Sequence, residues 1–188
     1  MTLGETIVSF GLLGLLLLLA LGFLVSMFKS YGQASVRHQL QTSGILLSER
    51  LVKELRTTGE PGLTLYQDED RSAFYLIPLE TVTTTGQQVW DDHGVLYYWT
   101  RANQTLSTSE TLPTGVDLGF APDSPPRPTP EQFLSLMDQP GRLLSEHVTL
   151  FEIVKTESLL TLDLGLEQSV SGGPTERYSV RRELSFKS

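Results

Sequence analysis

The first 28 residues constrain the fold of this chain more than any other stretch. Between Thr6 and Phe28 there is no charged side chain, and the run from Phe10 to Val25 contains only Leu, Gly, Ala, Phe and Val. About 20 apolar residues in a helix span the ~30 Å hydrocarbon core of a bilayer. The sequence therefore predicts a membrane-spanning helix within residues 1–28.

Glu5 is the one charged side chain before Lys29. A carboxylate inside a bilayer is costly unless something pairs with it. If Met1 carries a free α-amine, that amine lies one helical turn from Glu5 and has the opposite charge near neutral pH. A neighbouring copy, shifted along the helix axis, could place its own Glu5 against this amine and so set the axial register. The alternative is an ordinary anchor whose Glu5 stays in the headgroup layer.

The start of the chain, MTLGE before an apolar run, resembles the mature N-terminus of type IV pilins and pseudopilins, commonly FTLIE. In that family a prepilin peptidase removes a basic leader, the new N-terminus is methylated, and the glutamate serves in assembly. The resemblance implies that Met1 is the processed and methylated residue. It also implies that Thr2, Leu3 and Glu5 act in assembly. Two positions differ from the family pattern: residue 1 is Met, which leaves an initiator methionine open, and Gly22 replaces a frequent proline.

A secretory signal peptide is the competing interpretation of this stretch. Such peptides carry a basic segment before an apolar core of about 7–15 residues. No Lys or Arg precedes Lys29, and the apolar run is longer than that core. The sequence therefore favours a retained helix.

The helix is predicted to continue beyond the membrane. From Lys29 to Thr57 there is no proline, and apolar residues recur at intervals of three, four or seven, which places them on one stripe of a helix. They are Val36, Leu40, Leu47, Leu51 and Leu55. The segment 59–62, Gly-Glu-Pro-Gly, has residue types that follow a helix C-terminus. A helix of about 55 residues would be roughly 80 Å long, so its outer half, residues 29–58, must pack its stripe onto the following domain.

Gly14 and Gly22 interrupt the leucine-rich run. Glycine weakens a helix by up to about 1 kcal/mol relative to alanine, and in pilin-like filaments the segment between the corresponding positions can lose helical order. The resemblance therefore implies that the helix stretches between Gly14 and Gly22 on assembly. Glycine is also common in membrane helices for other reasons, and that interpretation stays open.

Composition limits what the rest of the chain can bind. All 14 Lys and Arg and 21 of the 22 Asp and Glu follow residue 28, so that part carries a net charge of −7. A nucleic-acid-binding surface is basic, so no nucleic acid partner is expected. The absence of cysteine excludes disulfides and thiolate metal sites. Residues 29–188 are enough for one soluble domain.

After Gly62 the apolar pattern changes to a period of two. Short β-branched or aromatic runs, separated by turn formers, cover Leu63–Tyr66, Ala73–Ile77 and Val95–Thr100. Such runs predict strands joined by tight turns, so the part from residue 63 to residue 188 is expected to be rich in β-structure.

The last 45 residues are predicted to form an antiparallel meander. Apolar residues alternate within Val148–Lys155, Leu160–Glu167 and Tyr178–Phe186. We expect the apolar face of this meander to cover the stripe of the long helix. Arg182 falls on that inward face, where a β-bulge or snorkelling at the sheet edge would explain it.

A proline-rich segment, residues 113–130, separates the two groups of strands and contains six of the 10 prolines. Proline cannot donate to a sheet ladder, so the segment is predicted to be a long surface connection, either solvated or docking a neighbouring subunit. A short helical turn is predicted from Thr129, with Phe133, Leu134 and Met137 facing inward.

Few side chains point to chemistry. Asp68, Glu69 and Asp70 could supply oxygen ligands to Ca²⁺, but the run lacks the EF-hand pattern and also suits a solvated turn. Trp90 and the aromatic residues at 97–99 could form a ligand site, although such residues are more often core on one face of a strand and rim on the other. The histidines are far apart, and the sequence has no phosphate-binding loop or nucleophile elbow. The sequence therefore predicts neither an enzyme nor a cofactor.

The order of elements resembles the larger minor pseudopilins, in particular the J-type component of type II secretion and the W-type minor pilin of type IV pili. The resemblance implies an α+β fold, in which a long N-terminal helix packs on an antiparallel β-sheet domain. It implies a single-pass protein of the inner membrane, with its N-terminus in the cytoplasm and its domain outside, which enters a filament during priming or at the tip.

The partners implied by this resemblance are other pilins or pseudopilins, the inner-membrane assembly platform, the prepilin peptidase and the lipid bilayer. Two alternatives stay open. One is a major pilin, which polymerises with itself. The other is a single-pass receptor or sensor whose domain binds a ligand on its aromatic strand.

Overall fold

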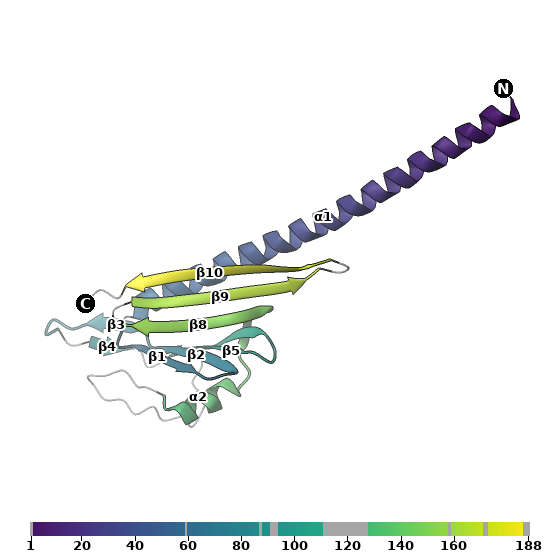
Figure 1. The fold of residues 1–188 in the computed structure, drawn as a ribbon. Helices are drawn as coiled ribbons and strands as arrows, with labels where there is room; N and C mark the ends of the chain where they lie inside the picture. The colour runs from purple at the N-terminus through teal and green to yellow at the C-terminus, as the bar shows by residue number, and fades with distance from the viewer. Residues whose placement is uncertain are drawn as a thin grey trace.

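A computed structural model describes residues 2–58, 60–86, 88–90, 94–110, 128–157, 159–170 and 173–185. Within these residues the chain forms helices and antiparallel sheets (Figure 1), which confirms the α+β class. The helices are α1 (Leu3–Thr58) and α2 (Pro130–Met137). The strands are β1 (Leu63–Gln67), β2 (Arg71–Leu76), β3 (Leu79–Val82), β4 (Gln88–Trp90), β5 (Val95–Thr100), β6 (Thr105–Ser109), β7 (Arg142–Ser145), β8 (Val148–Thr156), β9 (Leu159–Ser169) and β10 (Thr175–Ser185).

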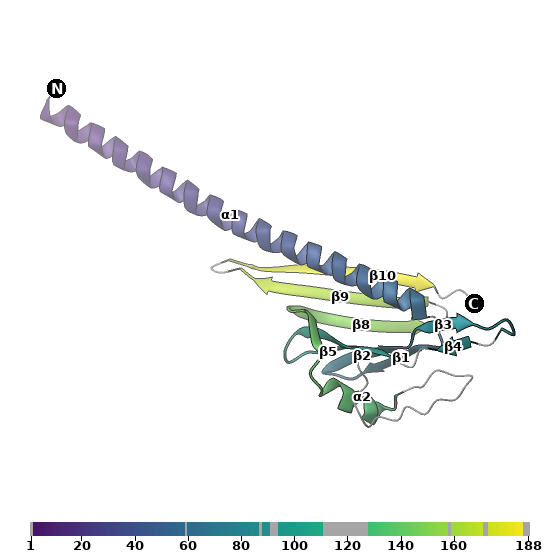
Figure 2. The ribbon, with the colours of Figure 1, turned by 180° about the vertical axis from the view of Figure 1, so that it is seen from behind.

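α1 is one unbroken helix of 56 residues whose two halves have different surroundings. From Thr2 to Tyr31 every residue is exposed, and this half projects away from the sheets (Figures 1 and 2). The outer half lies against β9 and β10. The predicted stripe is confirmed, since its four leucines are buried and Val36 is partly buried in the core. The helix also ends at Thr58, as predicted.

The last three strands form the predicted meander, in the order β10-β9-β8. β9 places four alternating leucines in the core beneath α1, and β10 adds Tyr178, Val180 and Leu184. The leucines are Leu160, Leu162, Leu164 and Leu166. The expectation that this face covers the helix stripe is therefore confirmed. Phe186, the last residue of the predicted strand, lies outside the described residues.

Arg182 lies on the half-buried face of β10, as the alternation indicated. The β-bulge offered to explain it is wrong, because β10 pairs with β9 in one continuous register from Thr175–Ser169 to Ser185–Leu159. β10 is the edge strand of its sheet, so snorkelling remains the explanation. Its Nε atom is buried and has no hydrogen-bond partner among the described residues.

The five-stranded sheet, in the order β1-β2-β5-β6-β7, is buried on both faces. One face turns Phe74 and Tyr97 toward α1 and β8, where Phe74 stacks on Tyr97 and Phe151 at centroid distances of 4.7 and 5.8 Å. The other face turns Tyr75 and Tyr98 toward α2. The aromatic residues on one face of β5 were expected to lie at an exposed rim. This expectation is wrong, because α2 covers that face.

α2 begins in a capping box, in which Thr129 and Gln132 exchange side-chain and backbone hydrogen bonds. Phe133 and Met137 face inward as predicted, but Leu134 is 36% exposed and Leu136 is buried in its place. A helix starting at Pro130 brings residues spaced by three and four to one face. Phe133, Leu136 and Met137 therefore share the face that packs on the sheet, and Leu134 lies on another face of the helix.

The predicted strands match β1, β2, β5 and β8–β10 to within three residues at each end. β3, β4, β6 and β7 were not predicted. β6, Thr-Leu-Ser-Thr-Ser, has one apolar residue, and the others are only three or four residues long, so their sequences lack a clear period of two. Most of the proline-rich segment, residues 111–127, lies outside the described residues.

Candidate functional site

The first turn of α1 carries a reciprocal pair of hydrogen bonds. The backbone N–H of Thr2 donates to Glu5 Oε2 at 2.8 Å, and the backbone N–H of Glu5 donates to Thr2 Oγ1 at 3.4 Å. This is a capping box, and its Thr-x-x-Glu spacing is visible in the sequence, although sequence reasoning overlooked it. Thr2 and Glu5 are thus brought together by helix geometry alone.

This capping box changes how Glu5 can act. One carboxylate oxygen, Oε2, already accepts a hydrogen bond, while Oε1 accepts none from the described residues. The internal bond reduces the cost of placing the carboxylate in an apolar medium, because a hydrogen-bonded charge is less costly to bury than a bare one. The free oxygen can accept a donor from another chain. Met1, the donor expected from the sequence, lies outside the described residues.

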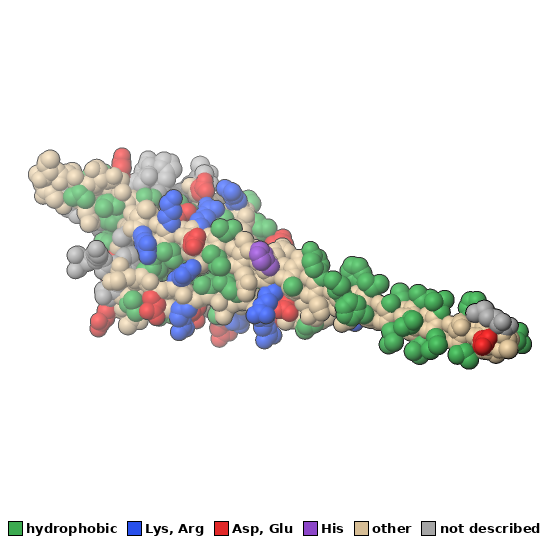
Figure 3. Space-filling model, turned by 90° about the horizontal axis from the view of Figure 1, so that it is seen from above, with side chains coloured by type: hydrophobic (Ala, Val, Ile, Leu, Met, Phe, Trp, Pro, Cys, Tyr) green, Lys and Arg blue, Asp and Glu red, His purple; other side chains and the backbone are tan. Residues whose placement is uncertain are grey.

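Residues 3–28 expose apolar side chains on every side of α1. Leu3 is 83% exposed, and Leu24, one of the most covered in this stretch, is still 45% exposed. Figure 3 shows the apolar groups along this rod, with one acidic group near its end. The helix is long and apolar enough to cross a membrane. A surface that is apolar all round suits surroundings of lipid or of other apolar helices.

Gly14 and Gly22 lie inside this exposed half. A methyl group added at either position would meet no other atom within 4 Å, so no contact within the chain requires glycine there. The helix is continuous through both positions. The stretching expected from the family resemblance stays a prediction about the assembled state.

The acidic run at Asp68–Asp70 forms the turn between β1 and β2. Asp68 Oδ1 accepts the backbone N–H groups of Asp70 and Arg71 at 2.8 and 2.7 Å, and Oδ2 accepts the hydroxyl of Tyr66 at 3.0 Å. Burial acts to raise the pKa of Asp68, but these hydrogen bonds outweigh it and the pKa is lowered. Asp68 therefore organises the turn. Among the described residues, no three His, Asp or Glu side chains are placed to hold a metal ion together.

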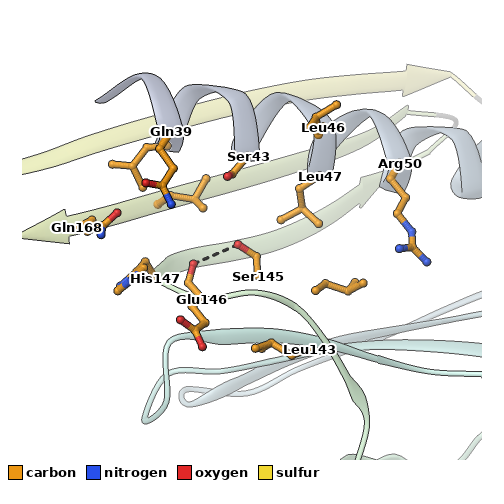
Figure 4. Close-up of a pocket in the computed structure, with 13 residues that line it drawn as sticks. Gln39, Ser43, Leu46, Leu47, Arg50, Leu143, Ser145, Glu146, His147 and Gln168 are labelled. Carbon is orange, nitrogen blue, oxygen red and sulfur yellow. Dashed lines mark hydrogen bonds between the residues drawn. The ribbon is translucent and has the colours of Figure 1, made fainter. Parts of the chain in front are cut away.

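A groove of about 530 Å³ separates α1 from the β7–β8 connection (Figure 4). Apolar and polar side chains share its lining: Gln39, Leu40, Ser43, Leu46, Leu47 and Arg50 from α1, and Leu143, Leu144, Ser145, Glu146, His147, Leu166 and Gln168 from the strands and their connections. Because the two walls are about 100 residues apart in sequence, no local pattern could reveal this groove.

Arg50 links the groove to the core behind it. Its Nε donates to Glu54 at 3.4 Å. Burial acts to lower the pKa of Arg50, but the neighbouring Tyr97 and Glu54 outweigh it and raise the pKa. The phenol of Tyr97 is fully buried beside this pair, and burial raises its pKa. The cluster joins the helix to the five-stranded sheet and fits a structural role.

A second hollow, of about 660 Å³, lies beside the β5–β6 turn and the end of α2. Its lining is polar, but Arg71 already pairs with Asp138 at 3.2 Å, and the Tyr98 hydroxyl donates to the carbonyl of Gln139 at 3.1 Å. The side chains of Arg71, Asp138 and Tyr98 are thus already engaged within the chain.

The aromatic ligand site considered for the β5 segment does not form. Tyr97, Tyr98 and Trp99 are 0%, 8% and 4% exposed, and the indole N–H of Trp99 donates to the carbonyl of Val148 at 2.7 Å. These rings therefore build the core.

Two of the three histidines lie within the described residues, far apart in the chain. His38 is exposed on α1 and His147 lines the groove, while His93 lies outside the described residues. The main candidate site among the described residues is thus the exposed apolar half of α1, residues 3–28, with the carboxylate of Glu5 near its end. Comparison with models of protein families, with curated proteins and with solved structures found no match for this chain.

Proposed function

We propose that this chain is a structural subunit of a type IV pilin-like filament, held in the inner membrane through residues 3–28 until it is recruited. One observation carries the proposal. A single helix joins an exposed apolar half, whose one charge is Glu5, to a second half that is part of the domain core. Such a helix can be a membrane anchor, an assembly surface and a rigid arm of the domain.

The apolar half supports assembly through packing. Its side chains are exposed on all sides, and inside a membrane apolar helices associate through van der Waals packing, because lipid tails are as apolar as the side chains they cover. Lipid covers this surface in the membrane, and the corresponding helices of neighbouring subunits would cover it in a filament. The exchange between two apolar surroundings requires no refolding of the chain.

The outer half supports the transmission of force. Four leucines of this half, Leu40, Leu47, Leu51 and Leu55, are buried in the core. At 1.5 Å per residue the domain is therefore held along about 22 Å of helix, and not by a flexible linker. A pull on the membrane-embedded half would move the domain with it.

Glu5 would set the register between neighbouring helices. Its Oε1 has no partner among the described residues, and an α-amine from an adjacent subunit could donate to it. In an apolar medium such a pair would select one axial offset, because the other offsets leave the carboxylate and the amine without an opposite charge. Processing and methylation of Met1 by a prepilin peptidase belong to the same proposal.

A minor pilin or pseudopilin, acting in priming or at the tip for pilus assembly or protein secretion, fits the chain better than other filament roles. The support is the order of elements, with a long helix, a mixed group of strands and a C-terminal meander. The J-type pseudopilin and the W-type minor pilin remain the particular types proposed.

Substitution at Glu5 tests the proposal. We expect Glu5→Ala and Glu5→Leu to leave the domain folded, as judged by circular dichroism and thermal unfolding, and to reduce recovery of the chain in sheared filaments. Glu49→Ala is the matched control, because Glu49 is an exposed carboxylate on the outer half of the same helix. Unchanged recovery of both Glu5 variants would remove the register mechanism.

The mass of the N-terminal peptide, from protein recovered from its native membrane, tests processing. A mono-methylated Met1 with nothing before it would support the filament role. A formylated, acetylated or leader-bearing start would leave Glu5 without the expected amine and count against that role.

A membrane-anchored receptor is the second candidate, and the groove between α1 and the β7–β8 connection is the observation in its favour. Ligand-dependent thermal stabilisation of the purified chain, without pilin partners, would support it. A major pilin would instead polymerise as the purified chain alone.

A further inference from the structure

We propose that the described residues at the end of the β9–β10 hairpin nearest the N-terminal half of α1, Ser169, Gly173, Pro174 and Thr175, rest on the lipid headgroups, and that Lys29 and Arg37 complete this membrane-contact surface. The inference rests on the membrane-spanning role proposed for residues 3–28. It adds the lipid surface as a partner of the domain itself and assigns the side of the domain that faces the bilayer.

The hairpin runs back along α1 toward the membrane-spanning half. The end of β9 and the start of β10 lie alongside the middle of the helix in both ribbon views (Figures 1 and 2). A methyl group at Gly173 would contact Gln33 Nε2 at 3.4 Å, which places this end of the hairpin level with Gln33. The backbone N–H of Gly173 donates to the carbonyl of Val170 at 2.9 Å.

Gln33 is close to the hydrocarbon boundary. Lys29 is the first charged residue after Glu5, so the apolar core of the bilayer ends near Phe28. Five residues of helix rise about 8 Å. The headgroup layer is roughly 5–8 Å deep on each side, from the difference between the total and hydrocarbon thicknesses of a bilayer. The hairpin end therefore lies at the outer limit of the headgroups.

The chemistry of this end suits a polar lipid surface. The described residues Ser169, Gly173, Pro174 and Thr175 are exposed and uncharged, so they approach the headgroups without desolvating a charge. On the helix, Lys29 and Arg37 are exposed and make no ion pair with the described residues. Lys29 lies at the inner side of the headgroup layer, whereas Arg37 lies about 14 Å beyond Phe28 and therefore just outside that layer. A cationic side chain is attracted to lipid phosphates when it lies within about one Debye length of the membrane surface.

Tyr31 adds a third element to the contact. Its side chain is 76% exposed on α1, between the hydrocarbon boundary and the hairpin end. Tyrosine is enriched at the membrane–water interface because its ring is amphipathic. Tyr31 and Gln33 are two residues apart and so lie on opposite sides of the helix. Headgroups surround the helix at this depth and can contact both sides at once, which argues for lipid as the occupant.

This contact would hold the domain in one orientation. A helix alone allows the domain to rotate about the membrane normal and to tilt, whereas a second contact beside the helix restricts the tilt toward the hairpin side. Recruitment into a filament would then have to lift the hairpin end off the headgroups.

The absence of cysteine permits a direct test. Thr175→Cys places a nitroxide label at the proposed contact, and Ser185→Cys is the matched control on the same strand. Both residues are exposed, and ten residues of strand separate them by about 33 Å. The full chain is reconstituted into vesicles of phosphatidylethanolamine and phosphatidylglycerol that contain a nickel-chelating lipid.

We expect nickel in the headgroup layer to enhance nitroxide relaxation several-fold more at position 175 than at position 185. Equal enhancement at both positions, in chain that co-floats with the vesicles, would overturn the contact while leaving the anchor and the filament role intact. Failure of the chain to co-float would overturn the contact and the anchor together.

A second variant tests the basic side chains. Lys29→Glu combined with Arg37→Glu is expected to lower the enhancement at position 175, because the anionic lipid would repel the new carboxylates. The same enhancement as in the unsubstituted background would overturn the assignment of Lys29 and Arg37 to lipid phosphates.

Discussion

Gly44 of α1 lies directly against the ring of Tyr178 of β10. A Cβ atom at position 44 would lie 2.5 Å from Tyr178 Cε1 and 2.6 Å from Cδ1, and 3.0 Å from a methyl group of Leu166. Glycine is therefore required at this point, because the helix backbone and the sheet approach each other too closely for a side chain. This contact sets how near the outer half of α1 comes to the meander.

Gly44→Ala should destabilise the domain even though alanine is the better helix former. Overpacking costs about 1–3 kcal/mol, against a gain of up to about 1 kcal/mol in helix propensity. Gly32→Ala is the control, since a methyl group there meets nothing within 4 Å and the variant should be as stable or more stable. Chemical unfolding of the full chain in detergent measures both. If Gly44→Ala matched Gly32→Ala, the close approach would be wrong.

Tyr75→Phe should leave the free energy of unfolding unchanged or higher at neutral pH. The Tyr75 hydroxyl is buried and has no hydrogen-bond partner among the described residues. Burying it without a partner costs free energy, and removing the hydroxyl removes that cost. Tyr98→Phe, on the same face of the sheet, should cost about 1 kcal/mol because it loses a hydrogen bond to Gln139. If both variants lost the same free energy of unfolding, the hydrogen bond of Tyr98 would not distinguish the two hydroxyls.

Stability should fall at alkaline pH. Burial raises the pKa of both Tyr75 and Tyr97 above the ordinary value of about 10. Above that pH the unfolded chain releases these protons while the folded chain retains them, so the unfolded state is favoured as pH rises. We expect the unfolding midpoint to be steady below about pH 9 and to drop above pH 10, and to drop less in Tyr75→Phe. An identical alkaline drop in that variant would exclude Tyr75 as a contributor.

Asp68 should behave as a turn residue rather than as a calcium ligand. Asp68→Ala loses three hydrogen bonds to the carboxylate and should cost about 1–2 kcal/mol, whereas Asp68→Asn keeps an acceptor and should cost less. Because the pKa of Asp68 is lowered, its contribution should be present above the ordinary pKa of about 4 and fade at lower pH. Millimolar Ca²⁺ should leave the thermal midpoint of the unsubstituted chain unchanged. If Ca²⁺ raised this midpoint, and did not raise it in Asp68→Ala, Asp68 would be a calcium ligand after all.

Several features followed from sequence because their causes are local. The bounds of the outer part of α1, its buried stripe and the three strands of the meander depend on periods of 3.6 and two residues, which any short window contains. The Thr2–Glu5 capping box has an equally local signature and could have been predicted. The position of Glu5 in an apolar run, on which the proposed function depends, is also evident from sequence alone.

Other features required the fold. Leu134 and Leu136 could not be assigned to outside and inside until the surface against which α2 packs was known. The two buried faces of β5 depend on α2 reaching a sheet that precedes it by about 30 residues.

The sequence by itself determined that the chain has an apolar, Glu5-bearing helix long enough to cross a membrane and a β-rich part after it, because chain-local periodicity and charge decide those properties. Only the tertiary structure decided that the backbone at Gly44 lies against the ring of Tyr178 and that the β9–β10 hairpin returns to the level of Gln33. These depend on distances between segments that pack together from far apart in the chain, and such distances are set by the packing of the whole core.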